Sequence, residues 1–262
     1  MNYLKIAHEA CDLSRQVILK YFRSDIGVTW KKDQTPVTIA DQEAEAVMRD
    51  FLKQKTPGYG FIGEEYGSDE MSQEFNWIID PIDGTKSFIK GVPLFGTLLA
   101  LYHGKTPILG IVDLPALNSR LWAEVGQGAW VDGRKAQVSN IVNLADSTLL
   151  TGTVNTIEDL GLAKAFNPMR KKAKLYRGWG DCYGYYLVAT GQAEAMFDPV
   201  VSIWDIAPMV PILQEAGGRF TDIKGRATLL EKILQGEPVG SDNFTGLATN
   251  GHIHKEMLKG FG

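Results

Sequence analysis

The feature that most constrains the fold is a series of short apolar segments in the first half of the chain, each ended by a turn. Strands are predicted at residues 77–79, 97–102, 108–113, 120–125 and 129–131. The last two are joined across a glycine-containing turn, and Asp132-Gly133 after them is a hairpin signal. Helices are expected over residues 3–23 and about 40–54, the second after the N-cap Thr38. Because strands joined by short turns pair antiparallel, we expect helices on a largely antiparallel sheet.

The second half of the chain shows a different pattern, in which strands and helices alternate. Beyond a polar stretch at 139–147, strands are predicted at 149–153, 174–176 and 193–197, and helices at 159–166, 183–191 and 205–216. In the last helix Pro208 fits the first turn, whereas Pro211 is expected to kink it. The fold class is therefore predicted to be α/β (α+β). Two domains are expected, an α+β domain at 1–143 and an α/β domain at 144–262.

Composition and charge argue against several classes of function. The 262 residues contain 27 Lys plus Arg against 31 Asp plus Glu, and a net charge of −4 does not favour a nucleic-acid surface. Two cysteines are too few for a disulfide framework or a four-cysteine zinc site, and Cys182 is expected to be a packing residue. His252 and His254 are expected to be solvated. Neither a signal peptide nor a membrane span is expected, which favours the cytoplasm.

Three acidic segments stand out: Gly63-Glu64-Glu65, the block from Asp80 to Thr85, and Trp204-Asp205. Each alone has an ordinary interpretation as a surface loop, a turn or a helix N-terminus. An ordinary turn does not explain the middle block well, because an apolar strand leads directly into Asp80, and Asp83 follows around a proline. Two carboxylates held close together repel unless a cation lies between them or one is protonated.

The chemistry of these groups predicts a metal and phosphate site. Carboxylate oxygens suit Mg²⁺ or Mn²⁺ better than zinc. Gly84 and Thr85 offer backbone N–H groups where a helix can begin, which is a natural anion cradle. Metal-binding acids beside an anion cradle point to phosphoryl chemistry, in which cations stabilise the attacking and leaving oxygens.

The segments GEE at 63–65, WIIDPIDGTKSF at 77–88 and WD…EAGG at 204–218 resemble the inositol monophosphatase superfamily of Mg²⁺-dependent phosphomonoesterases. The resemblance runs through nearly the whole chain. It implies a layered αβαβα sandwich with the metal site between its two halves, a small phosphomonoester as substrate, and a homodimer. Pro208 departs from the family, in which a small apolar residue is more usual, and this leaves the shape of the Asp205 helix open.

The resemblance also implies roles for individual residues. The metal ligands for two or three Mg²⁺ ions, which Mn²⁺ can replace, would be Glu64, Asp80, the carbonyl of Ile82, Asp83 and Asp205. Asp80 would bridge two ions, and a third ion would lie near Glu64. Thr85 would orient the attacking water and Asp41 would accept a proton through it, so that Asp41, Glu64 and Thr85 are the predicted catalytic residues. Glu65 is expected to support Glu64, with direct metal binding left open.

Short sequence motifs resemble the histidinol-phosphate phosphatase branch of the family. They lie at residues 84–88, 177–184 and 197–199, and Pro211 is a further point of resemblance. Histidinol phosphate carries an ammonium group and an imidazole, whereas inositol offers only hydroxyls. A carboxylate at Asp181, with Asp198 nearby, would favour a cationic substrate. The predicted phosphate- and substrate-binding residues are Gly84, Thr85, Asp181, Asp198 and Asp205.

Alternatives remain open at this point. Asp181 could cap the helix that follows it, and Asp198 could be a turn residue before Pro199. Trp179 and Tyr183 could line the pocket or pack in the core, and core packing is expected. The main alternative function is the same chemistry on inositol 1-phosphate or another small sugar phosphate. A metal or phosphate sensor without activity is the alternative from another class, but its expected signature, the loss of a catalytic or metal-binding residue, is absent.

Overall fold

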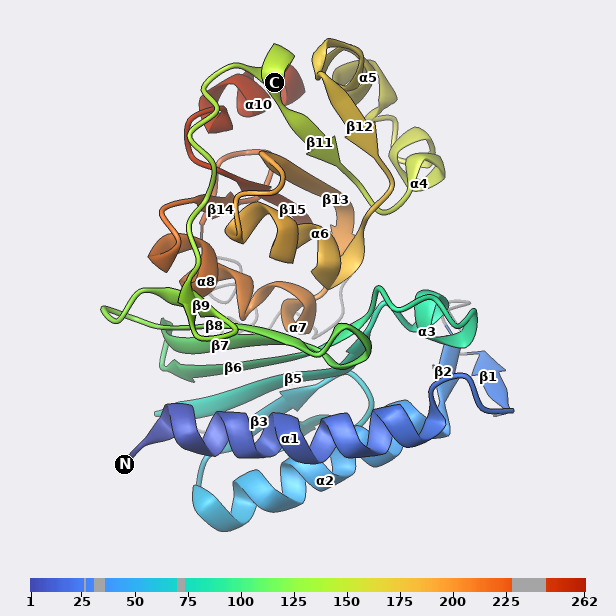
Figure 1. Cartoon of the computed structure of the whole chain (residues 1–262), viewed down its shortest axis with the longest axis vertical. Coiled ribbons are helices and arrows are strands. Elements are labelled where there is room, and N and C mark those ends of the chain that lie inside the picture. The colour runs from blue at the N-terminus through green and yellow to red at the C-terminus, as the bar shows by residue number, and fades with distance from the viewer. Residues whose placement is uncertain (26, 31–35, 70–73, 228–243) are drawn as a thin grey trace.

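A computed structural model describes residues 1–25, 27–30, 36–69, 74–227 and 244–262 of the chain. The described elements form five layers, in which helices and sheets alternate (Figure 1). Helices α1 and α2 cover one face of an eight-stranded sheet, and α6, α7 and α8 lie between this sheet and a five-stranded sheet. Helices α4, α5 and α10 cover the outer face of the second sheet. The predicted αβαβα sandwich is confirmed.

The helices have these bounds: α1 Tyr3–Tyr21, α2 Ile39–Lys55, α3 Thr85–Ile89, α4 Val154–Asp159, α5 Ala163–Lys172, α6 Asp181–Ala189, α7 Ile203–Ile206, α8 Met209–Glu215 and α10 His254–Phe261. Helix α2 begins as predicted, because the Thr38 side chain accepts from the Ala40 N–H and the Asp41 side chain accepts from the Thr38 N–H. None of the helices described is both long and apolar enough to cross a bilayer.

The eight-stranded sheet contains the predicted antiparallel meander. Its order is β10-β9-β8-β7-β6-β5-β3-β4, and of its pairs only β3 with β5 is parallel. Its strands are β3 Gly60–Gly63, β4 Gly67–Asp69, β5 Phe75–Asp83, β6 Gly96–His103, β7 Thr106–Leu114, β8 Ser119–Glu124, β9 Ala129–Val131 and β10 Arg134–Lys135. A separate antiparallel pair is formed by β1 Val28–Trp30 and β2 Pro36–Thr38.

The five-stranded sheet is mixed, with order β12-β11-β13-β15-β14. Its strands are β11 Thr148–Leu150, β12 Leu175–Arg177, β13 Ala195–Val201, β14 Arg219–Thr221 and β15 Phe244–Thr249. Strand β11 is parallel to both of its neighbours, whereas β15 is antiparallel to β13 and β14. The chain passes from one sheet to the other between β10 and β11. The division into domains 1–143 and 144–262 stays a prediction.

Two predicted helices differ in the structure. The helix expected at 159–166 is replaced by α4 and α5, with Gly161 between them at a φ of +71° that ends α4. The helix expected at 205–216 is divided into α7 and α8 around Pro208, not kinked at Pro211. Pro211 is the third residue of α8, in the first turn, where a backbone N–H has no helical partner to lose.

The two histidines near the C-terminus have different environments, and the expectation for one of them is wrong. His252 is exposed as predicted, but His254 is 1% exposed. The His254 imidazole lies between two hydroxyl groups, 3.1 Å from Thr221 Oγ1 and 2.9 Å from Thr249 Oγ1. These hydrogen bonds satisfy both ring nitrogens and so allow the burial, which lowers the pKa of His254 to about 4.

Candidate metal and active site

Three predicted metal ligands meet at the end of β5. Oxygens of Asp80, Asp83 and Asp205 all lie within 4.8 Å of one another. Asp80 is 1% exposed, whereas Asp83 and Asp205 are partly exposed. Desolvation, followed by repulsion from neighbouring carboxylates, raises the pKa of Asp80 well above its usual range.

This cluster of three carboxylates has the chemistry of a site for a divalent cation. Asp80 Oδ1 is buried and makes no hydrogen bond in the described part of the chain. An oxygen of this kind, facing other carboxylates, needs either a proton or a cation. A set of oxygen ligands alone suits Mg²⁺ or Mn²⁺. The identity of the ion and the number of ions stay predictions.

A bulge in β5 brings the two acids of the block together. In a regular strand, residues three positions apart point to opposite faces of the sheet. The pairing of β5 with β6 shifts between Asp80, opposite Leu98, and Asp83, opposite Gly96. The extra residue at such a bulge turns the later side chain back toward the earlier one, so Asp80 and Asp83 share a site.

Asp205 reaches this group from the middle layer. Ser202 and Asp205 form a capping box at the start of α7, in which the Ser202 N–H donates to Asp205 Oδ2 at 2.6 Å. Desolvation is the largest effect on this carboxyl group and raises the pKa of Asp205 to about 8, although the bond from Ser202 opposes the shift. The capping box leaves the other carboxylate oxygen for a further ligand.

The break after α7 is fixed by contacts with the eight-stranded sheet. If α7 and α8 were one continuous helix, the carbonyl of Ala207 would pair with the N–H of residue 211, but that residue is Pro211, which has none. The buried Tyr102 hydroxyl on β6 donates to this carbonyl instead, at 2.9 Å. On β7, a Cβ at Gly110 would lie 2.3 Å from the oxygen of Pro208, so only glycine lets the break approach the sheet.

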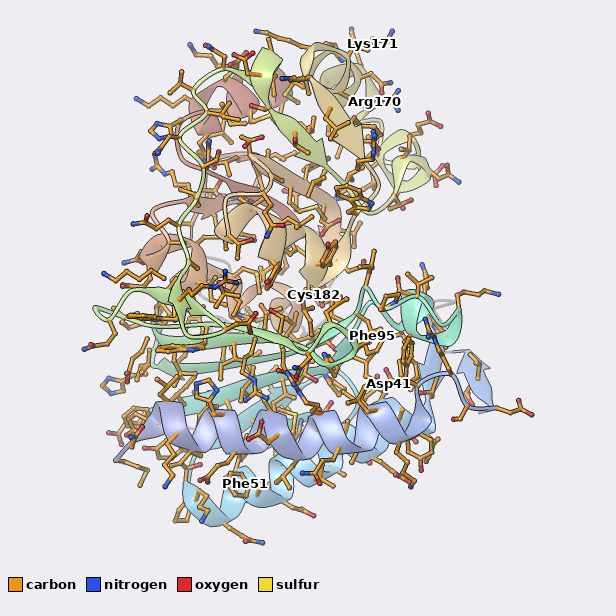
Figure 2. All side chains as sticks on the ribbon, viewed as in Figure 1. Asp41, Phe51, Phe95, Arg170, Lys171 and Cys182 are labelled. Carbon is orange, nitrogen blue, oxygen red and sulfur yellow. The ribbon has the colours of Figure 1, made fainter. Side chains whose placement is uncertain are left out.

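The structure also brings Thr85 and Asp41 together. Gly84 precedes α3 with a φ of +85°, and Thr85 begins the helix. Thr85 Oγ1 donates to the carbonyl of Ile82 at 2.9 Å and lies 3.4 Å from Asp41 Oδ1. Figure 2 shows Asp41 and Cys182 approaching the eight-stranded sheet from opposite sides, with Phe95 between them.

Asp41 is held by the N-cap of α2. Its Oδ2 accepts from the Thr38 N–H at 2.8 Å and from the Thr38 hydroxyl at 2.6 Å, which leaves Oδ1 facing Thr85. Desolvation raises the pKa of Asp41 to about 6, against the lowering effect of the Thr38 bonds. Thr85 Oγ1 and Asp41 Oδ1 are therefore neighbours at the long end of hydrogen-bond distance, and they must approach each other before a proton can pass between them.

Glu64 follows β3 and lies outside the group of three, but its charge reaches that group. Its N–H donates to the carbonyl of Ile79 at 3.2 Å. Its negative charge contributes to the raised pKa values of Asp80, Asp41 and Asp205. The adjacent Glu65 is bonded through its N–H to Glu45 Oε2 at 2.8 Å.

Glu45 and Arg49 anchor this acidic turn, and the sequence analysis missed both. Glu45 is fully buried, and its Oε1 accepts from Arg49 Nε at 2.7 Å. A Cβ at Gly63 would lie 2.0 Å from Glu45 Oε1, so the glycine of the GEE segment makes room for this carboxylate. Two opposite charges four residues apart on the sheet-facing side of α2 are the signal that could have identified them.

The carboxyl groups of Asp181 and Asp198 both lie close to Gly152. A Cβ at Gly152 would lie 3.3 Å from Asp198 Oδ1 and 3.8 Å from Asp181 Oδ1, and one at Gly84 would lie 3.3 Å from Asp181 Oδ2. Burial, followed by the charge of Asp181, raises the pKa of Asp198 to about 7. Burial also raises the pKa of Asp181, which the charge of Lys86 opposes.

The structure excludes the ordinary interpretations of Asp181 as a helix cap and of Asp198 as a turn residue, and their role in substrate binding stays a prediction. Asp181 begins α6 with a φ of +54°, and no side chain caps this helix. Asp198 lies within β13 and not in a turn. Trp179 is 39% exposed, so the expectation that it packs in the core is wrong, because it precedes α6 on the surface. Tyr183 is partly buried and stacks on Tyr186, with ring centroids 6.2 Å apart.

The N-terminus of α6 is linked to the candidate metal site through Cys182. The Cys182 N–H donates to Asp83 Oδ2, and its thiol lies 3.8 Å from the carbonyl oxygen of Asp83. The thiol is fully buried, and desolvation raises the pKa of Cys182 well above its usual range. This confirms Cys182 as a packing residue.

Comparison with known proteins identifies the family. The model of the inositol monophosphatase family matches residues 2–259. The chain belongs to the inositol monophosphatase family. Members of this family are phosphomonoesterases, and the chain is a hydrolase of this kind.

Relatives within the family carry two kinds of name. The chain is 41% identical over 241 residues to a histidinol-phosphatase of Chlorobaculum parvum, covering 92% of both chains. It is 35% identical over 263 residues to a histidinol-phosphatase of Mycobacterium tuberculosis, covering 98% of this chain and 95% of that one. An inositol monophosphatase from Zymomonas mobilis superposes with a TM-score of 0.84 at 29% identity, covering 99% of this chain and 97% of that one.

Proposed function

We propose that this inositol monophosphatase family member hydrolyses L-histidinol phosphate to L-histidinol and phosphate, with Mg²⁺ as cofactor, in histidine biosynthesis. The observation that carries the proposal is the pair of partly exposed carboxylates, Asp181 and Asp198, beside the proposed metal-binding acids. The histidinol-phosphatase names of two relatives support the same substrate.

The carboxylate pair favours a cationic alcohol over a neutral one. Both groups have raised pKa values because each is desolvated, and for Asp198 the charge of Asp181 adds to the shift. The ammonium group of histidinol would relieve the repulsion and form charge-assisted hydrogen bonds. The hydroxyls of inositol carry no charge and would leave the repulsion in place. The structure therefore provides a physical reason for preferring histidinol phosphate.

The proposed ligands for Mg²⁺ are those implied by the sequence: Glu64, Asp80, the carbonyl of Ile82, Asp83 and Asp205. Bound Mg²⁺ would stabilise charge on the phosphate oxygens and lower the pKa of the attacking water. The backbone N–H groups at Gly84 and Thr85 would bind the phosphate, since the first N–H groups of a helix have no partner within it.

Residues of the chain would accept the proton that the attacking water loses. Thr85 Oγ1 would accept a hydrogen bond from the attacking water, which fixes the direction of attack. Its own hydroxyl proton would turn from the Ile82 carbonyl toward Asp41 Oδ1, 3.4 Å away, and would pass to Asp41 as the proton of the attacking water passes to Thr85 Oγ1. Asp41 is suited to accept it, because burial places its pKa near 6. The Thr38 hydrogen bonds would hold the other oxygen of Asp41 in place.

A panel of small phosphomonoesters, assayed for phosphate release with Mg²⁺ and with a chelator, tests the proposal. We expect release to require Mg²⁺ and kcat/KM to be highest for L-histidinol phosphate. Inositol 1-phosphate is the second candidate, supported by the fold shared with the Zymomonas mobilis protein. Absence of metal-dependent release from every ester would contradict the phosphatase proposal and favour a sensor. A cytoplasmic homodimer is part of the proposal, and sedimentation would test its oligomeric state.

A further inference from the structure

We propose that Ser14 and Thr97 are positioning residues, which set the geometry of the metal-binding turn from Asp80 to Asp83 through the main-chain carbonyl of Pro81. The inference rests on the proposed function, because it takes Asp80 and Asp83 as metal ligands. Neither residue belongs to the acidic segments that predict the site. Both come from the eight-stranded half of the molecule, Ser14 from α1 and Thr97 from β6.

The contacts form a directed relay. Thr97 Oγ1 donates to the carbonyl of Pro81 at 2.8 Å and lies 3.0 Å from Ser14 Oγ. A threonine hydroxyl has one proton, and here it is used on Pro81. Ser14 must therefore donate to Thr97. Both side chains are fully buried, so water does not compete for these bonds.

The relay ends at the bulge that brings the two acids together. Thr97 lies on β6 between Leu98, which faces Asp80, and Gly96, which faces Asp83. Pro81 has no N–H, so this part of β5 lacks one donor of the regular ladder. The Thr97 hydroxyl instead holds the peptide unit between Pro81 and Ile82. The orientation of that unit sets the direction of the Ile82 carbonyl and of the two acids that flank it.

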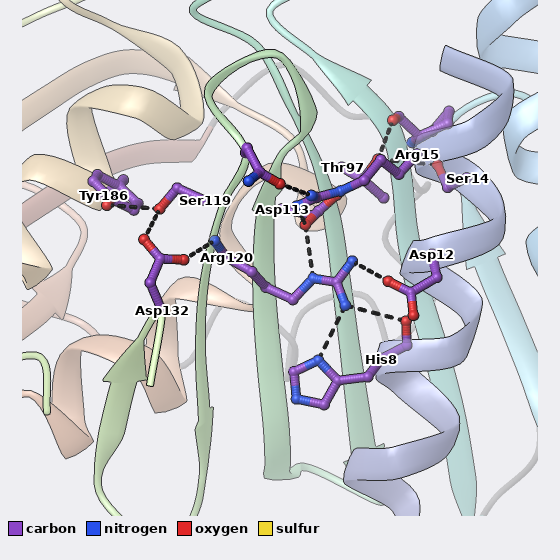
Figure 3. Close-up of polar contacts among 12 residues, drawn as sticks. His8, Asp12, Ser14, Arg15, Thr97, Asp113, Ser119, Arg120, Asp132 and Tyr186 are labelled. Carbon is purple, nitrogen blue, oxygen red and sulfur yellow. Dashed lines mark hydrogen bonds and ion pairs between the residues drawn. The ribbon is translucent and has the colours of Figure 1, made fainter. Parts of the chain in front are cut away.

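An ion-pair network holds α1 against the sheet beside Ser14. Figure 3 shows Arg15 and Arg120 both reaching Asp113, which is fully buried on β7. Arg15 contacts the two Asp113 oxygens at 2.6 and 3.0 Å, and Arg120 Nε contacts Asp113 Oδ1 at 2.7 Å. Asp113 is the β7 partner of Thr97 in the strand register. The network therefore fixes Ser14 and Thr97 relative to each other.

Three variants of the full chain test the relay by direct Mn²⁺ binding, followed by electron paramagnetic resonance. Thr97→Val keeps the shape but leaves the Pro81 carbonyl without its donor, so we expect the Kd for Mn²⁺ to rise about 10- to 100-fold. Thr97→Ser keeps the hydroxyl and should bind Mn²⁺ close to the wild-type value. Ser14→Ala keeps the bond to Pro81 and should show a smaller rise in Kd than Thr97→Val.

Thr56→Val is the matched control. Thr56 is also buried, at the C-terminus of α2. It accepts from the indole of Trp77, near the start of β5 and away from the acids at its end, at 3.0 Å, and donates to the carbonyl of Leu52 at 2.7 Å. We expect this variant to lower the melting temperature without changing Mn²⁺ binding. The comparison separates loss of a buried hydroxyl from loss of turn geometry.

The outcomes distinguish this inference from the proposed function. Wild-type Mn²⁺ affinity in Thr97→Val, or equal weakening in Thr97→Ser and Thr97→Val, would overturn the positioning role alone. A wild-type chain that binds no Mn²⁺ would overturn the proposed metal ligands and the relay with them. Mn²⁺ binding that weakens equally in Thr56→Val would show a general effect of stability and would also overturn the role.

Discussion

Asp205 is the acid through which the second half of the molecule joins the candidate metal site. Its pKa is raised to about 8, far above that of a carboxyl group in an unfolded chain. A raised carboxyl pKa favours folding below the unfolded pKa and loses that contribution as the pH rises through the folded value. At pH 8 the ionised group therefore opposes folding unless a cation neutralises it.

Asp205→Asn should have opposite effects on stability and activity. Without metal at pH 8, we expect its melting temperature to exceed that of the wild type, because a source of repulsion is removed. Mg²⁺ should then raise the melting temperature less than in the wild type, and kcat/KM should fall about 100-fold or more. Calorimetry and phosphate release measure the two effects, with the exposed Asp159→Asn as control. Wild-type activity in Asp205→Asn would contradict its role as a ligand.

The raised pKa of Asp41 predicts how kcat falls on the acidic side (the acidic limb) of the pH profile. Its pKa is raised to about 6, and in the proposed mechanism only the ionised form would accept a proton from Thr85. Bound cations would lower this value, so we expect kcat to fall about tenfold per pH unit at or below pH 6. In Asp41→Asn the limb should disappear and kcat should fall about 100-fold. A profile with the same limb in wild type and Asp41→Asn would assign that limb to another group.

At the scale of elements, the break between α7 and α8 fixes where Asp205 points. Tyr102→Phe removes the donor to the Ala207 carbonyl, which Pro211 leaves without a helical partner. We expect the free energy of unfolding to fall by about 1–3 kcal/mol, the cost of a buried carbonyl without a donor. Mg²⁺ affinity should fall as well, because α7 carries the proposed ligand Asp205. Chemical denaturation and calorimetric titration would measure both, and unchanged values would contradict the contact's role.

The elements that the sequence predicts well are those with local signals. The meander, the Thr38 cap and the acidic block at the end of β5 follow from periodicity and turn residues close in the chain. The divided helix at Pro208 was not predicted, because its cause is contact with Gly110 and Tyr102 on strands about 100 residues away. Such contacts have no signature in a single sequence.

The same limit applies to the residues that support the site. The full set of predicted ligands and the pair Thr85–Asp41 came from a resemblance in the acidic segments. The structure groups three of these ligands, Asp80, Asp83 and Asp205, and brings Thr85 next to Asp41. Glu45 could have been suspected from its charge on the buried face of α2. Burial of His254 depends on hydroxyl partners supplied by other elements, which sequence position does not reveal.

At the scale of the whole molecule, two sheets contribute to one site. The eight-stranded half supplies Asp80 and Asp83, whereas the other half supplies Asp181, Asp198 and Asp205. Short loops at Gly84 and Gly152 allow Asp181 to lie between the halves. The first half therefore provides most of the proposed metal ligands. The second half provides the carboxylates that would determine the substrate preference.

The most direct test is the ratio of kcat/KM for L-histidinol phosphate to that for inositol 1-phosphate, measured with Mg²⁺ in wild type and in Asp181→Asn. The account predicts a ratio well above one in the wild type. Asp181→Asn should lower it about tenfold or more, through loss of one charge-assisted bond to the ammonium group. A wild-type preference for inositol 1-phosphate, or a ratio that Asp181→Asn leaves unchanged, would contradict the account.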